Sequence, residues 1–169
     1  GSPGGSPIGM HSFNEWPQRF AAQHPEWLAL QGAGHRLTQE GSMGGHVCFA
    51  DEEVLAQTIA DKRQEFEEKP WRLYSSVMPG DSMGAYMCRC EDCQAAVRPE
   101  KPSGGRHTDY VWSFVNKVAR ETRKSHPRRL ITCASYSDYS AVPENFELEP
   151  NVAVTLCIGF ASLNLATSA

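Results

Sequence analysis

The chain has 169 residues, with 16 basic and 20 acidic side chains and a formal net charge of −4. This length suffices for one domain with a single core. The acidic balance argues against a nucleic-acid partner, because such proteins normally carry a basic patch. No apolar run approaches the roughly 20 residues that cross a bilayer, so we expect no membrane partner.

The composition predicts three parts. Residues 1–11 are rich in Gly, Ser and Pro and are expected to be a tag or linker, residues 12–158 form the domain, and residues 159–169 form a small, polar tail. The first residues show neither the positive region nor the apolar region of a secretory signal. The compartment stays open, with an extracytoplasmic location among the alternatives.

Helical and strand patterns then alternate along the chain. A short helix is predicted within 12–24, followed by a glycine-rich loop over 31–45. A longer helix begins after Asp51, a good N-cap, and ends before Pro70. A strand over 72–78, a helix from 108 or 109 to 126, and strands over 129–136 and 152–158 complete the order.

This order predicts an α/β fold with a parallel sheet. The strand over 129–136 is almost continuously apolar at its centre, which is typical of a strand covered on both faces. A complete (β/α)8 barrel needs about 250 residues, so the chain would hold roughly half of one. The alternative is a small open sheet. Half a barrel would leave uncovered edges, and self-association through them is expected.

A cysteine array lies in the loop that follows the strand over 72–78. Cys88, Cys90 and Cys93 could give three thiolates to a structural zinc ion, with His46, Cys48 or His107 as the fourth ligand, and we favour His46. The alternatives are a disulfide between Cys90 and Cys93, free thiols, or a redox pair. The redox pair is disfavoured because no helix is predicted to begin at the cysteines. The remaining two cysteines, Cys133 and Cys157, are expected to be small buried hydrophobes.

Several segments occur in a fixed order that resembles a known family. They are HPEWLAL (24–30), HVCFADEEV (46–54), Pro79-Gly80-Asp81, MCRCEDC (87–93), YVWSFVNKVA (110–119) and ITCASYSDYSAVPENFELEPNVAVTLC (131–157). Together they resemble a bacterial family of domains of unknown function related to glycoside hydrolases. That family is grouped with the α-glucuronidase-like barrels and includes endo-β-N-acetylglucosaminidases.

The resemblance covers about residues 12 to 157 and implies a portion of a TIM-like barrel with a glycan or oligosaccharide substrate. It favours a catalytic role for Asp81 over a turn or N-cap role. Tyr86 and Tyr136 are the candidate rings for sugar stacking. No motif identifies the second carboxylate that a glycosidase needs, and four residues stay open: Glu91, Asp92, Asp109 and Asp138. The competing hypothesis is a non-catalytic, zinc-binding α/β module.

Overall fold

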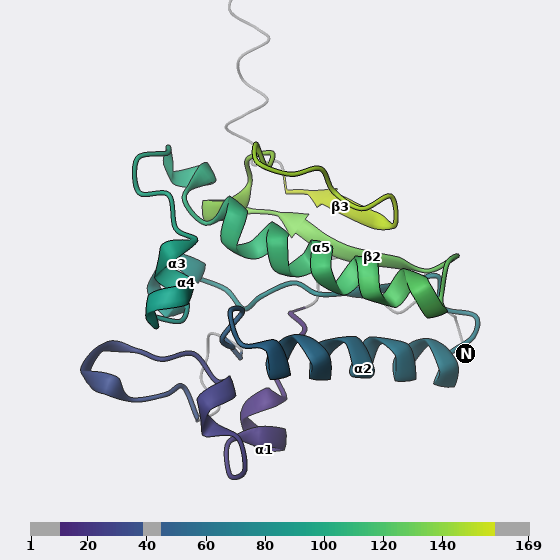
Figure 1. The fold of residues 1–169 in the computed structure, drawn as a ribbon, viewed down its shortest axis with the longest axis horizontal. Helices are drawn as coiled ribbons and strands as arrows, with labels where there is room; N and C mark the ends of the chain where they lie inside the picture. The colour runs from purple at the N-terminus through teal and green to yellow at the C-terminus, as the bar shows by residue number, and fades with distance from the viewer. Residues whose placement is uncertain (1–10, 39–44, 158–169) are drawn as a thin grey trace, which may run out of the picture.

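A computed structural model describes residues 11–38 and 45–157 (Figure 1). It confirms the α/β fold: the described residues contain a three-stranded sheet with strand order β1-β2-β3, and both strand pairs are parallel. The predicted tail, and the predicted linker apart from His11, lie outside this part of the chain. In chain order the elements are α1 (Trp16–Phe20), η1 (Pro25–Trp27), η2 (Gly32–Gly34), α2 (Glu52–Glu68), β1 (Tyr74–Ser76), α3 (Met83–Tyr86), α4 (Glu91–Ala95), η3 (Ser103–Gly105), α5 (Thr108–Ser125), β2 (Leu130–Ser135), η4 (Ser137–Tyr139) and β3 (Val152–Leu156).

Strand β2 is the centre of the sheet. Tyr74 of β1 pairs with Leu130, and Ile131 pairs with Val152 of β3. Residues 131–134 are all buried, as expected for a parallel strand covered on both faces. The carboxyl ends of the strands therefore lie at one edge of the sheet, and the loops after β1 and β2 start there.

Helix α2 begins as the sequence predicts. The Asp51 side chain accepts hydrogen bonds from the N–H groups of Glu53 (2.8 Å) and Val54 (3.3 Å). The acidic first turn is favoured by the helix dipole. The helix contacts α5 and β1 through a face that includes Ile59 and Phe66.

Helix α5 covers one face of the sheet and contacts β2 and β3 (Figure 1). Its apolar stripe is fully buried, and Phe114 stacks on Phe49 with ring centroids 4.1 Å apart. The buried Asn116 donates from Nδ2 to the Glu147 carbonyl (3.0 Å) and accepts from the Glu149 N–H (2.6 Å). It thereby fixes the segment that leads into β3. None of the helices in the described residues has the length and apolar character to cross a membrane.

The N-terminal segment forms a small unit beside α2 (Figure 1). It contains α1, η1 and η2, and antiparallel bridges join Leu28 to Val47 and Leu30 to Arg36. The segment is tied to β1 at its start, because His11 forms a parallel bridge with Met78. Gly45 lies so close to this segment that an added Cβ would be 1.7 Å from the Phe13 carbonyl oxygen.

Three predictions about detail were wrong. Strand β1 covers only Tyr74–Ser76 rather than 72–78; Leu73 just before it is 60% exposed, although its carbonyl accepts from the Leu130 N–H (2.9 Å). Cys157 is exposed rather than buried, because it follows the edge strand β3. Two short helices, α3 and α4, occupy the loop that was expected to lack helices. The barrel stays a prediction, because the described residues hold only an open three-stranded sheet.

Candidate functional site

Four cysteines gather at one place in the structure. The Sγ atoms of Cys48, Cys88, Cys90 and Cys93 all lie within 4.8 Å of one another. The Cys48 Sγ is 3.6 Å from the Sγ atoms of both Cys90 and Cys93. Cys90 is half-buried and the other three are buried, and all are free thiols. We call this group the four-cysteine cluster.

Two chain segments that are far apart in sequence build the cluster. Cys48 comes from the N-terminal unit, where its N–H donates to the Trp27 carbonyl (2.8 Å). The other three cysteines come from the loop after β1. Cys90 is the N-cap residue of α4, which corrects the expectation that no helix begins at the cysteines. Gln94 of the same helix donates to the Cys88 carbonyl (2.9 Å) and fixes the loop.

Hydrogen bonds converge on the Cys88 sulfur. The N–H of Leu30 donates to Cys88 Sγ (3.4 Å), and the N–H of Arg89 donates back to the Leu30 carbonyl (2.8 Å). Bonds from the Cys48 and Cys93 thiols, with further help from backbone N–H groups, hold the pKa of Cys88 far below its usual range. The bond with Cys88 raises the pKa of Cys48 to about 12. The hydrogen bonds around Cys88 therefore favour a thiolate at this sulfur.

The cluster fits a tetrahedral metal site. Zinc–sulfur bonds of about 2.3 Å in a tetrahedron place the sulfurs about 3.8 Å apart, and the observed Cys48–Cys90 and Cys48–Cys93 separations are 3.6 Å. Thiolates are soft ligands that select zinc over magnesium or calcium. Four protein ligands also close the coordination sphere, which is typical of a structural site.

His46 is not part of this cluster. Its Nε2 lies 2.8 Å from the backbone carbonyl oxygen of Asp81, and the side chain is buried. Burial lowers the pKa of His46, so the neutral ring donates from Nε2 to that carbonyl. Among the three candidates for the fourth position, the structure brings Cys48 to the other cysteines and leaves His46 and His107 elsewhere.

Asp81 follows β1 at the carboxyl edge of the sheet. Its side chain is 51% exposed, and Oδ2 lies 3.3 Å from the Nε2 of His11. The same His11 ring contacts the Pro79 carbonyl through Nδ1 at 2.6 Å. Sequence analysis missed His11 because it was assigned to the linker. The bridge between residues 11 and 78 is a long-range contact with no local signal.

Tyr86 and Tyr136 lie in the loops after β1 and β2. The Tyr86 ring is 5.9 Å from the His46 ring, so His46 joins Tyr86 to the backbone of Asp81. Tyr136 is 38% exposed and contacts Tyr139 edge-on instead. We refer to Asp81, Tyr86 and Tyr136 as the carboxyl-edge residues.

Two further candidates meet at this edge. The Nδ1 of the buried His107 lies 3.7 Å from Oδ2 of Asp138. Burial lowers the pKa of His107 although Asp138 opposes the shift, and Arg106 lowers it further. Asp138 also lies against α3, because a Cβ added at Gly84 would be 2.5 Å from its Oδ2. Of the four open carboxylates, Asp138 is thus placed against the helix that follows Asp81.

Comparison with known proteins gives a family without an assigned function. No curated protein and no solved structure matches the chain. A family model matches residues 3–164, which is nearly the whole chain. The chain therefore belongs to the family described as Domain of unknown function (DUF4838).

Proposed function

We propose that this protein is a zinc-binding α/β module in which Cys48, Cys88, Cys90 and Cys93 hold one structural zinc ion. The convergence of four thiol sulfurs within 4.8 Å carries the proposal. Sulfurs this close together from two separate chain segments match the arrangement in which cysteines surround a tetrahedral zinc ion.

The role of the ion is to join two parts of the fold. One ligand lies in the N-terminal unit and three lie in the loop after β1, so the metal fixes this loop at the carboxyl edge of the sheet. The N–H bond from Leu30 to Cys88 supports a thiolate at this position, since outer hydrogen bonds orient metal ligands and tune their basicity. The closed ligand set supports a structural rather than a catalytic ion.

Native mass spectrometry of the purified chain, together with a count of reactive thiols, tests the proposal. We expect one zinc per chain and protection of the four cluster thiols, in addition to Cys133, which burial alone protects. Cobalt substitution should then give the intense thiolate-to-metal charge-transfer bands of a sulfur-rich site. A chain that carries no metal after zinc is supplied, with the four cluster thiols reactive, would refute the proposal.

A second candidate function is that of a glycoside hydrolase-like, carbohydrate-active domain. The observation that favours it is the position of the carboxyl-edge residues: Asp81 is exposed, and both tyrosines lie in loops that follow parallel strands, where ligands bind in α/β proteins. The family resemblance of the sequence supports the same conclusion. In this hypothesis Asp81 contributes one of the two carboxylates of a glycosidase, and Asp138, which lies against α3, is the candidate for the other.

Hydrolysis of chromogenic glycosides tests this second candidate. Activity that is lost in Asp81→Asn, with zinc content unchanged, would support it. If the zinc-loaded chain cleaves none of a broad set of glycosides, the module has no hydrolase function of its own.

A further inference from the structure

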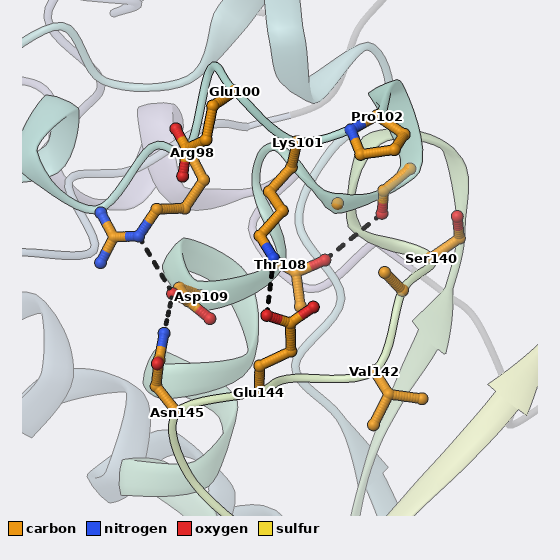
Figure 2. A pocket seen from close by; sticks show the side chains of 13 residues that line it. Arg98, Glu100, Lys101, Pro102, Thr108, Asp109, Ser140, Val142, Glu144 and Asn145 are labelled. Carbon is orange, nitrogen blue, oxygen red and sulfur yellow. Dashed lines mark hydrogen bonds and ion pairs between the residues drawn. The ribbon is translucent and has the colours of Figure 1, made fainter.

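A pocket of about 510 Å³ opens beside the first turn of α5 (Figure 2), and none of the four clustered cysteines lines it. Its walls are residues 98–105 of the loop after β1 and residues 140–145 of the loop after β2. The volume lies within the usual range of ligand pockets, which is about 300 to 1,000 Å³. Both loops start at the carboxyl edge of the sheet, where parallel α/β folds bind ligands.

The two loops and the first turn of α5 all contribute hydrogen-bond donors or acceptors to the pocket. Arg98 Nε lies 3.4 Å from Asp109 Oδ2, and the same oxygen accepts from Asn145 Nδ2 at 2.8 Å. Lys101 Nζ lies 2.6 Å from Glu144 Oε2. Figure 2 shows these two groups side by side across the pocket. Each group offers N–H donors beside carboxylate acceptors, which is the arrangement that adjacent hydroxyl groups require.

The charges of the lining exclude a strongly anionic ligand. Two cationic side chains, Arg98 and Lys101, face three carboxylates, Glu100, Asp109 and Glu144. Each cation is already paired with a carboxylate. A ligand carboxylate or phosphate would compete with these carboxylates and add to the negative excess. A neutral hydroxyl can instead bridge a donor and an acceptor without breaking an ion pair.

Few of the lining residues are apolar. Pro102, Ala141 and Val142 border the pocket, and Val142 is 82% exposed. None of the lining residues is aromatic, so a flat hydrophobic ligand finds no stacking surface. A strip of this kind suits the C–H face of one sugar ring whose hydroxyls reach the polar groups.

We propose that this pocket binds a neutral saccharide unit rather than a uronic acid or a phosphorylated sugar. The proposal rests on the carbohydrate-active candidate function. It adds the location of a sugar-binding site and a preference for uncharged sugars. Arg98, Asp109 and Asn145 form one hydroxyl-binding group, and Lys101 and Glu144 form the other.

Titration of the zinc-supplied, ¹⁵N-labelled chain with neutral and charged tetrasaccharides tests the proposal. The probes are cellotetraose, tetra-N-acetylchitotetraose and tetragalacturonate, followed by backbone amide shifts. We expect a neutral probe to shift the amides of Gly104, Gly105 and Ala141. Asn145→Asp, which loses the amide donor and adds a carboxylate beside Asp109, should weaken this binding at least tenfold.

Glu147→Gln is the matched control, because Glu147 lies in the same loop but outside the pocket. The control should bind as the wild type does, and the amide spectra report whether each variant is folded. Shifts confined to the surroundings of Asp81 and Tyr86 would overturn the pocket while leaving the carbohydrate function standing. Binding of tetragalacturonate alone would overturn the preference for neutral sugars. No shift with any probe would overturn the pocket and the carbohydrate function together, and the zinc proposal would be unaffected.

Discussion

On the zinc proposal, replacing Cys48 by serine should remove most of the stability that the metal would give to this protein. Cys48 is the only ligand from the N-terminal unit, whereas the other three lie within six residues of one another. A metal bridge between Cys48 and Cys90 closes a loop across a separation of 42 residues. Restricting the unfolded chain by a cross-link of this length is worth about 4 kcal/mol.

Urea denaturation with and without a chelator measures this contribution. We expect the free energy of unfolding of the wild type to fall by about 4 kcal/mol when zinc is removed. The free energy of unfolding of Cys48→Ser should be close to that of the zinc-free wild type and should change little on chelation, because its three remaining cluster cysteines belong to a single loop. Cys157→Ser is the control, since Cys157 is exposed and outside the cluster.

Two results would refute this reasoning. If Cys48→Ser kept the full zinc-dependent stability, the metal would not join the two segments. If Cys157→Ser lost as much stability as Cys48→Ser, the effect would come from thiol chemistry in general rather than from the cluster.

Three further predictions concern the fold. Gly45→Ala should destabilise the protein by roughly 3 kcal/mol, because the new Cβ would be 1.7 Å from the Phe13 carbonyl oxygen. Gly32→Ala is the control, since its Cβ would meet nothing within 4 Å. Equal melting temperatures for the two variants would contradict this prediction. Asn116→Ala should cost about 2 to 4 kcal/mol in urea denaturation by leaving buried backbone groups unpaired, and a loss below 1 kcal/mol would show that water replaces the amide. Burial lowers the pKa of His107 in the folded state relative to the unfolded chain. Its contribution to stability is therefore complete above about pH 6.5 and is lost as pH falls below that value. His107→Gln should reduce the dependence of the free energy of unfolding on pH between pH 7 and 5, and an unchanged dependence would show that other groups cause it.

The main elements of the fold could be predicted because their signals are local. The N-cap at Asp51, the proline after α2 and the apolar centre of β2 each lie within a few residues of the feature that they determine. The length of β1 could not be predicted in this way. Leu73 has the right chemistry for a strand, but whether it pairs depends on a neighbouring strand more than 50 residues away.

The candidate site, too, could be predicted only where its signal is local. The array of Cys88, Cys90 and Cys93 is visible in the sequence, whereas the choice of Cys48 over His46 depends on how the N-terminal unit folds against the loop after β1. A bridge between Leu28 and Val47 positions Cys48, and nothing in the sequence near the array indicates that contact. The barrel and self-association through its edges stay predictions.

The position of the four ligands along the chain has a consequence for biosynthesis. All of them lie between residues 48 and 93, while β2 begins at Leu130 and β3 at Val152. A chain leaving the ribosome therefore carries a complete ligand set before its first strand has any partner. If the cluster binds zinc as proposed, metal capture can precede strand pairing, and zinc shortage would leave the nascent N-terminal half exposed to chaperones and proteases for longer.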